Sequence, residues 1–445
     1  MEHHKSFKVF GYGLLVLVFL NLLFICGYAF EVKAAPEKKP IKIYSPVGLT
    51  GPWSYVMKPQ LLGYQTYFKY VNEIEGGVEG HPIELIWADS SYDPTKTMTM
   101  YKRWKSEGNV PLIILTGSPD GEATKATLEK DKVVGIDLYC SDPMFYPPAY
   151  TYGVGTTYHE MHMVWLRYIA KTWHRPEKPV LATYYPEFPW AFHFDKMFKE
   201  TAQRFGINYV GLELAKPGAP SLKPELERLM AKGVNQIMTI LPTGLVKILF
   251  SSMDEMGIRN KMDIGLWAGI YLEEIGRIVG PSFDGITGIG WYPVEEDTVT
   301  KPKLKKIKEY WDKTTGGEKF ESPQMSGWMM GEIAVQAIRQ TIRKVGYDNL
   351  SGENLKKYGF DAIKDWEGDV HPKTTITPAN QTSARLNRVY RYKDSKLHGA
   401  EDWTPRPELT RDLKTGAVDW AKYFESSDWA KFSKGANPIE RYSKP

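Results

Sequence analysis

Residues 41–55 read IKIYSPVGLTGPWSY and give the clearest indication of the fold class. The first four of these residues are typical of a short strand, and two glycines and two prolines then favour a tight loop. A helix is expected to begin near Gln60 after this loop. Strand, loop and helix in that order form the first unit of a parallel sheet covered by helices. Trp53 and Tyr55 lie in the loop, where their rings supply contact area.

The same alternation continues along the chain, with short apolar runs separated by longer segments of helical period. Strands are expected at 41–44, 83–87, 112–115 and 133–136, and a second series at Val180, Tyr209, Gln236, Ile264 and Ile286. Helices are expected to begin near Pro94 and Gly121 and to span 158–172, 301–313 and 329–344. This pattern predicts an α/β protein with two βαβ series, in which ligands bind beyond the carboxyl ends of the strands.

Length and composition agree with an ordinary globular protein of two domains. The chain has 445 residues, of which 42% are hydrophobic and 25% charged. Lysine and arginine total 57 against 53 acidic residues, and the basic side chains are scattered rather than massed in blocks. This distribution argues against nucleic acid as a partner.

The N-terminus has the order of a secretory signal. Two lysines precede an apolar run over residues 9–25, and small residues follow before a charged stretch. Cleavage is expected after Ala34, with Ala29 as a second possible cut, so that residues 1–34 would be a signal peptide. The mature chain would then carry 54 basic and 51 acidic side chains and be nearly neutral.

Two other interpretations of this segment remain open. The apolar run approaches the roughly 20 residues needed to span a bilayer, so it could be retained as a membrane anchor. Cys26 could suggest lipidation, although the bulky Ile25 stands before it, where a lipoprotein signal usually needs a small residue. If the segment is removed, Cys140 is the one cysteine left, so no intramolecular disulfide is expected.

The usual signatures of enzymes and metal sites are missing from the sequence. There is no nucleophile elbow, no phosphate-binding loop of the Walker type and no dinucleotide fingerprint. His159 and His162 are three residues apart, which does not match the zinc spacing of His-Glu-x-x-His. Carboxylates near the expected strand ends, Asp120, Asp137, Asp142 and Glu187, are interpreted as loop caps rather than an acid/base pair. We therefore predict no metal, no cofactor and no catalytic residue.

At this point the sequence resembles the type I periplasmic binding proteins of ABC importers, specifically the leucine/isoleucine/valine-binding group. The residues that carry the resemblance are 46–55, the helix 63–71 leading into NEIEGGVEGHPI at 72–83, and DSSYDP at 89–94. The loop CSDP at 140–143 and the tail 375–403 fit as well, with strand features at 389–392 and 401–403. Beyond Trp403 the similarity fades.

The resemblance implies two doubly wound, Rossmann-like lobes joined by three hinge crossings, with a ligand cleft between them. The crossings are expected near 154–156, 288–292 and 371–374. Residues 41–153 and 293–371 would form lobe 1, residues 157–288 and 372–403 lobe 2, and residues 404–445 a C-terminal extension. Binding would shift a population from an open to a closed form, without a reaction.

The resemblance also implies which residues contact the ligand. In lobe 1 the ligand's carboxylate would be held around Ser118, Asp120, Tyr139 and Ser141, because hydroxyls and amides at a helix start attract anions. Trp53 and Tyr55 would face the same cleft. In lobe 2 the matching loops supply four further candidates: Trp190, Thr243, Trp267 and Tyr271. For Trp190 and Trp267, burial in the core is the competing interpretation.

One departure from the family pattern bears on the ligand. Amino-acid binders commonly have an acidic residue near the position of Ala268, to pair with the ligand's ammonium group. A buried ammonium without a partner is costly, so a simple α-amino acid would need another acid, and Asp120 and Glu187 are the nearby candidates. The aromatic residues instead favour a small aromatic or branched carboxylate.

Partners and localisation follow from the same resemblance. A periplasmic monomer that delivers its ligand to ABC transporter permease subunits is expected. Two rivals are kept: a ligand-sensing receptor or regulator of the same fold, and a hydrolase that uses carboxylates of the cleft.

Overall fold

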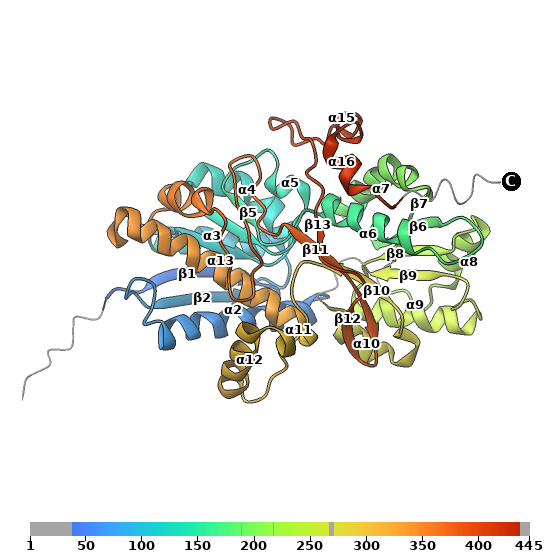
Figure 1. Ribbon diagram of the computed structural model, residues 1–445. Coiled ribbons are helices and arrows are strands. Elements are labelled where there is room, and N and C mark those ends of the chain that lie inside the picture. The colour runs from blue at the N-terminus through green and yellow to red at the C-terminus, as the bar shows by residue number, and fades with distance from the viewer. Residues whose placement is uncertain (1–37, 188, 217, 267–270, 437–445) are drawn as a thin grey trace, which may run out of the picture. The chain divides into compact units, whose positions relative to one another are not determined.

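The computed structural model describes residues 38–187, 189–216, 218–266 and 271–436. The expected signal peptide with Ala29, Cys26 and Ala34, and also Trp267 and Ala268, lie outside the described residues. The rest is organised around two sheets, one parallel and one mostly parallel, whose strands alternate along the chain with helices (Figure 1). The α/β class and the two-lobed architecture expected from the sequence are therefore confirmed.

The first sheet has the order β2-β1-β3-β4-β5, and every pair in it is parallel. Its strands are β1 (Ile41–Val47), β2 (Ile83–Asp89), β3 (Leu112–Leu115), β4 (Val134–Asp137) and β5 (Thr151–Gly153). The helices between them are α2 (Ser54–Ile74), α3 (Pro94–Glu107), α4 (Ser118–Asp131) and α5 (Asp142–Phe145). We call this sheet and the helices packed on it the first lobe.

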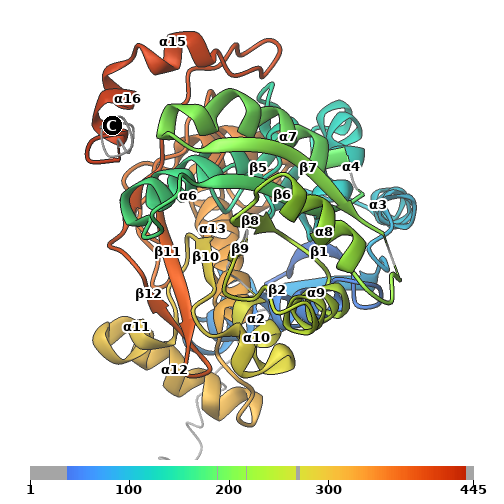
Figure 2. The same cartoon turned by 90° about the vertical axis from the view of Figure 1, so that its right-hand side faces the viewer.

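The second sheet has the order β12-β11-β10-β9-β8-β6-β7. Its strands are β6 (Val180–Pro186), β7 (Asn208–Ala215), β8 (Gln236–Thr239), β9 (Asp263–Leu266), β10 (Thr287–Gly290), β11 (Leu386–Lys393) and β12 (Lys396–Gly399). Its helices are α6 (Tyr158–Thr172), α7 (Pro189–Thr201), α8 (Lys223–Ala231), α9 (Thr243–Glu255) and α10 (Leu272–Val279). We call this unit the second lobe. Its last two strands are antiparallel to their neighbours (Figure 2).

After β10 the chain returns to the first lobe through α11 (Glu295–Thr300), α12 (Pro302–Thr315), α13 (Ser322–Val345) and α14 (Gly352–Asn354). Helix α13 packs along α2 and also contacts β4. Helix α11 instead bonds to the second lobe, because Glu296 accepts the backbone N–H of Gly399 at 3.0 Å. The chain ends with β13 (Thr404–Pro405), α15 (Trp420–Phe424) and α16 (Ser427–Phe432).

The chain passes between the lobes three times. The first passage joins β5 to α6 and the second follows β10, close to the expected positions. The third lies later than the expected 371–374, because Ser383 still donates its backbone N–H to Gly153 of β5 at 2.8 Å. The chain then enters the second sheet at Leu386. The limits proposed for the lobes remain a prediction.

Helix α2 is the element that differs most from expectation, because it begins at Ser54 instead of near Gln60. Pro59 lies within its first two turns, where a proline removes one backbone hydrogen bond but does not end the helix. The early start carries Trp53 to the N-cap and Met57 into the first turn. By contrast, β3 and α6 have the bounds that the hydrophobic pattern predicts.

Within the described residues, none of the helices is long and apolar enough to cross a bilayer.

Candidate functional site

A small cavity lies where strand ends of both sheets meet. The described residues that line it are Trp53, Met57, Tyr92, Ser118, Tyr139, Tyr158, Trp190, Ile240 and Tyr271. Each follows the carboxyl end of a strand: six residues follow strands β1 to β5 of the first sheet, and three follow β6, β8 and β9 of the second. In open parallel sheets this edge is the usual place for ligands, because the loops that follow neighbouring strands converge there.

The loop after β1 is fixed by a single carboxylate. Asp89, at the end of β2, accepts the backbone N–H groups of Leu49 at 2.9 Å and Thr50 at 3.2 Å, and the hydroxyl of Thr50 at 2.8 Å. These bonds hold the pKa of Asp89 below its ordinary value, despite some burial. Asp89 thereby sets where the chain turns into α2, and so where Trp53 lies.

Two glycines make room for Tyr92. A Cβ atom on Gly117 would lie 2.5 Å from the Tyr92 ring, and one on Gly48 would lie 3.2 Å from the Tyr92 backbone nitrogen. A larger side chain at Gly117 would therefore displace the ring, and one at Gly48 would meet Met57 Sδ at 2.6 Å as well as the Tyr92 backbone. The Tyr92 ring also lies 6.4 Å from the Trp53 ring, so the two aromatics form one wall of the cavity.

The polar atoms of the cavity wall are hydroxyls and one indole. Ser118 Oγ and Tyr158 Oη lie 2.5 Å apart, and the side-chain amide of Gln60 donates to Tyr139 Oη at 3.0 Å. The Nε1 of Trp53 is buried and has no hydrogen-bond partner among the described residues. Since an unpaired buried donor is costly, this N–H is available to an acceptor on a ligand.

The second lobe contributes an aromatic wall as well. Trp190 on α7 lies 5.6 Å from the ring of Tyr185 and 5.4 Å from that of Phe194, and its side chain is 7% exposed. Tyr271, just before α10, meets Trp53 at 6.5 Å and Tyr55 at 6.2 Å between ring centroids. The lobes therefore contact each other through aromatic rings at the cavity.

Not every residue expected in the site lines the cavity. Ser141 is buried and donates its hydroxyl to Glu122 at 2.7 Å, and Asp120 accepts from the Thr97 hydroxyl at 3.0 Å. Tyr55 is half-buried and lines a neighbouring groove instead. The side chain of Thr243, at the start of α9, and the whole of Trp267 lie outside what the structure describes, so their part in the site stays a prediction. The other five, Trp53, Ser118, Tyr139, Trp190 and Tyr271, line the cavity together.

Four lining residues are absent from the expected set: Met57, Tyr92, Tyr158 and Ile240. Tyr92 belongs to the 89–94 segment that carries the family resemblance, so its place after β2 was a usable signal. Tyr158 is the first residue of α6, directly after the passage between the lobes. Met57 could not be found without the early start of α2. Ile240 follows β8 directly and carries no polar signal.

The described side chains that form the wall of the cavity are electrically neutral. No lysine, arginine, aspartate or glutamate is among the described lining residues. Behind the wall, burial raises the pKa of Asp120 to about 7, against the opposing hydrogen bond from Thr97. Burial also raises the pKa of Asp137 well above its usual range, although the N–H of Tyr139 opposes the shift. Glu187 is exposed.

The cavity has a volume of about 30 Å³. One water needs roughly 10–15 Å³ of such space, whereas ligand pockets usually measure about 300–1,000 Å³. The space therefore fits a water or two but no amino acid or aromatic acid. Entry of a solute requires the two aromatic walls to separate, and this is the motion that two hinged lobes allow.

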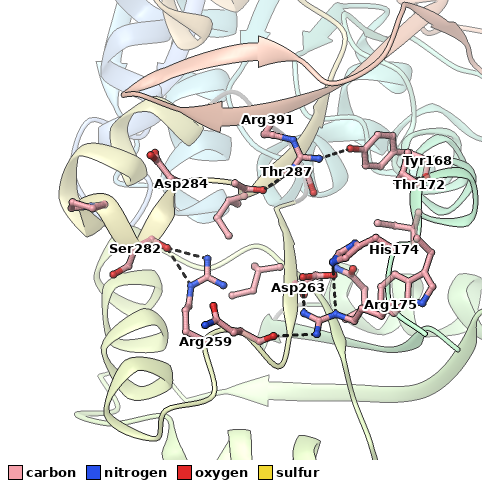
Figure 3. Close-up of a pocket in the computed structure, with 18 residues that line it drawn as sticks. Tyr168, Thr172, His174, Arg175, Arg259, Asp263, Ser282, Asp284, Thr287 and Arg391 are labelled. Carbon is pink, nitrogen blue, oxygen red and sulfur yellow. Dashed lines mark hydrogen bonds and ion pairs between the residues drawn. The ribbon is translucent and has the colours of Figure 1, made fainter. Parts of the chain in front are cut away.

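A larger hollow lies elsewhere, at the amino ends of β8, β9 and β10, with a volume of about 580 Å³ (Figure 3). Its three arginines are already bonded within the lobe. Arg175 forms a bidentate pair with Asp263 at 2.9 and 3.2 Å, and Arg259 donates twice to the carbonyl of Ser282 at 3.0 and 3.2 Å. Arg391 donates to Tyr168 Oη at 2.9 Å. Because each of the three arginines already has a hydrogen-bond partner within the lobe, we interpret them as structural groups.

Among the described residues, no three histidine, cysteine or acidic side chains lie together in a group that could hold a metal ion. His162 is fully buried between the carbonyl of Tyr158 at 2.5 Å and the hydroxyl of Tyr185 at 3.3 Å. Burial lowers the pKa of His162 to about 3, so its ring is neutral and structural. His159 bonds to Asp142 at 2.5 Å.

Comparison with known proteins gives one family and many solved structures. The periplasmic binding protein family matches residues 40–395. A branched chain amino acid ABC transporter protein from Thermus thermophilus with bound valine is 18% identical, with a TM-score of 0.73 over 83% of this chain and 97% of that one. A fatty acid ABC transporter substrate-binding protein from Thermomonospora curvata is 19% identical, with a TM-score of 0.72 over 82% and 92%.

A solute binding protein of an ABC transporter from Rhodopseudomonas palustris HaA2, in complex with p-hydroxybenzoic acid, is 18% identical. Its TM-score is 0.67, over 83% of this chain and 97% of that one. No curated protein sequence matches the chain. At these identities the solved structures show a shared fold, while the family match covers most of the sequence. The chain belongs to the periplasmic binding protein family.

Proposed function

We propose that this protein is the extracytoplasmic solute-binding protein of an ABC importer and captures a small aromatic or branched carboxylate by lobe closure. The observation that carries the proposal is the aromatic cavity, which is built from strand ends of both lobes and lined by neutral side chains. The three similar structures named above are ABC transporter proteins by their descriptions, and one holds p-hydroxybenzoic acid.

The lining supports the ligand class. Rings of Trp53, Tyr92 and Trp190 bury an apolar or aromatic body, while Ser118 and the indole N–H of Trp53 give neutral donors to an oxygen acceptor. The ammonium group of an α-amino acid would find no carboxylate among the described lining residues. Neither compensating acid fits, since Asp120 is bonded to Thr97 behind the wall and Glu187 is exposed.

The remaining expectations form part of the same proposal. The protein acts in the periplasm as a monomer, passes its ligand to permease subunits and catalyses no reaction. Of the residues expected from the sequence, the ligand site includes Trp53, Ser118, Tyr139, Trp190 and Tyr271, and the cavity wall adds Met57, Tyr92, Tyr158 and Ile240.

Native mass spectrometry tests the proposal directly. The protein is purified from its own periplasm, and any retained small molecule is released and identified. A carboxylate without an ammonium group is expected. A Trp53→Ala variant should lose the retained mass, whereas Trp87→Ala, which removes an indole that is 45% exposed on β2, should keep it.

Other outcomes are equally informative. A retained α-amino acid would keep the binding function and overturn the ligand class. A mass that changes with incubation time would indicate turnover and favour an enzyme. If no molecule is retained and a thermal-shift screen of carboxylates and amino acids gives no hit, the binding function itself is wrong.

A further inference from the structure

The C-terminal residues 404–436 follow the end of the family match at residue 395, and they run along the boundary between the lobes. We call residues 404–436 the strap. It begins as β13, which pairs with β11 of the second lobe, and it ends as α15 and α16. Figure 1 shows it in red, above α5 and α6.

The two ends of the strap are attached to the second lobe. At its start, Thr404 pairs with Asn387 of β11. At its end, the ring of Trp429 meets that of Phe205 at 5.2 Å, and Arg167 of α6 donates to the carbonyl oxygen of Phe432 at 2.7 Å. The guanidinium of Arg204 also lies 4.5 Å from the ring of Phe424.

The middle of the strap contacts the first lobe. Arg411 forms an ion pair with Asp142 of α5, and its guanidinium lies 4.1 Å from the ring centre of Tyr146. Gly416, at a φ of +76°, lies so close that an added Cβ would meet the Tyr146 side chain at 2.5 Å. Both partners in the ion pair are buried, because the side chains of Arg411 and Asp142 are 4% and 9% exposed.

The same side chains connect the lobes to each other. Asp142 also binds His159 of α6 at 2.5 Å, and Arg411 reaches the hydroxyl of Thr157, the N-cap of α6, at 3.4 Å. Arg406 makes a second link, since it pairs with Glu160 of α6 at 3.3 Å and bonds to Thr382, which bridges to Gly153 of β5. Although burial would raise it, the charges of Arg411 and His159 hold the pKa of Asp142 below its usual range.

We infer that the strap holds the lobes in the closed arrangement, with Arg411 as the positioning residue that joins α5 to α6. The inference rests on the proposed function, because it concerns how closure over the ligand cavity is controlled. A buried ion pair that loses one partner leaves an uncompensated charge, so separation of α5 from α6 is disfavoured while Arg411 and Asp142 remain paired. The strap thus shifts the open–closed equilibrium before any solute binds.

A distance measurement between the lobes tests the inference without reference to the ligand. Spin labels are placed on cysteines that replace Lys102 of α3 and Glu227 of α8, both exposed. Cys140 is fully buried and does not compete for label. Pulsed electron paramagnetic resonance is recorded on protein freed of solute by dialysis and checked by mass spectrometry. In Arg411→Gln the ratio of open to closed protein should rise about tenfold.

Two further variants separate the strap from general stability. Gly416→Val pushes the strap away from Tyr146 without removing a charge, and it should lengthen the distances as Arg411→Gln does. Arg175→Gln breaks a partly exposed pair with Asp263 that lies wholly within the second lobe. It should lower the melting temperature and leave the distance distribution of the wild type unchanged.

The inference is wrong if Arg411→Gln and Gly416→Val both fold cooperatively and keep the wild-type distances. This outcome is distinct from failure of the proposed function. If the protein retains no solute but the strap variants open, the proposed function is wrong and the inference about the strap holds. If the protein binds a solute and the distances are unchanged, the proposed function holds and the inference about the strap is wrong.

Discussion

Trp190 belongs to both the cavity and the core of the second lobe. Its ring lines the cavity while it contacts Tyr185 and Phe194, and all three side chains are at most 7% exposed. From the sequence, ligand contact and core packing are alternatives for this residue. The structure shows contacts on both sides of the same ring, so a substitution should affect stability and binding together.

Replacement of Trp190 by alanine should lower the free energy of unfolding by about 2–4 kcal/mol, since a large buried ring leaves a cavity. The affinity for the solute found by mass spectrometry should fall at least about tenfold. Denaturant unfolding and calorimetric titration measure the two effects. Phe198→Ala is the matched control on α7, because Phe198 is fully buried and is not among the lining residues. The Phe198→Ala variant should lower the free energy of unfolding and leave the affinity for the solute unchanged. An unchanged affinity in Trp190→Ala would remove this residue from the site.

Asp120 makes a prediction about pH. Its pKa in the folded protein is about 7, raised chiefly by burial from an ordinary value of 3.8. Between pH 4 and 7 the folded state therefore holds a proton that the unfolded state has lost, and stability falls as the pH rises through this window. Asp120→Asn keeps an acceptor for Thr97 and removes the titration.

The Asp120→Asn variant should gain stability relative to the wild type as the pH rises from 4 to 8, by about 1–4 kcal/mol in total. Urea unfolding at pH 4, 6 and 8 measures the difference between the two proteins. Asp348→Asn, at an exposed position, should show no such trend. A pH-independent difference for Asp120→Asn would mean that its carboxyl group is ionised throughout this range.

Among the secondary-structure elements, the crossing of α2 and α13 does most to position the cavity. A Cβ on Gly63 would overlap the carbonyl oxygen of Gln324, and a Cβ on Gly327 would overlap that of Gln60. The two helices therefore approach as closely as their backbones permit. This contact fixes the first turns of α2, which carry Trp53 and Met57 to the cavity and Gln60 to Tyr139.

Gly327→Ala should separate these helices and destabilise the protein by about 1–3 kcal/mol, as expected when volume is forced into a close-packed contact. It should also weaken solute binding, because α2 moves with the contact. Gly244→Ala is the control, since an added Cβ there meets no atom within 4 Å, and alanine is the better helix former. Thermal unfolding and titration of both variants test the prediction. If the Gly327→Ala and Gly244→Ala variants are equally stable, the α2–α13 contact can accommodate a methyl group at little cost in stability.

Across the whole molecule, a second set of bonds holds the lobes together on α10. Arg277 pairs with both carboxylate oxygens of Glu321, the N-cap of α13, at 2.7 and 2.8 Å. On the same helix, Glu273 accepts the hydroxyl of Ser322 at 2.7 Å, and burial raises its pKa to about 7. These contacts join the second lobe to the first, next to Tyr271.

Arg277→Gln should speed dissociation of the bound solute about two- to fivefold, because a partly exposed ion pair contributes about 0.5–1 kcal/mol to the closed form. Stopped-flow displacement measures the rate. Arg228→Gln removes a comparable pair with Glu213 that lies within the second lobe, and it should leave the rate unchanged. If both variants behave alike, the α10 contact has no part in closure.

Much of this architecture could be predicted from the sequence, because buried parallel strands and amphipathic helices leave a local periodic signal. The predicted ranges 112–115 and 158–172 are those of β3 and α6. Trp53 could be predicted because it follows the end of the first expected strand, whereas Ser118 and Tyr139 were implied by the family resemblance; all three line the cavity. The start of α2 could not be predicted from local signals, because Pro59 lies within the first two turns of the helix and does not end it.

The α/β class, the two βαβ series and the loops at the strand ends could be predicted from the sequence alone, because each depends on residues close together in the chain. Which side chains meet depends on the packing of segments that are far apart in the chain. Asp142 contacts Arg411, 269 residues away, and Ser141 binds Glu122 instead of lining the cavity. Partners so far apart leave no periodic trace in the sequence, because their contact depends on how lobes and strap pack. The neutral aromatic wall and the links between the lobes are therefore properties of the folded molecule.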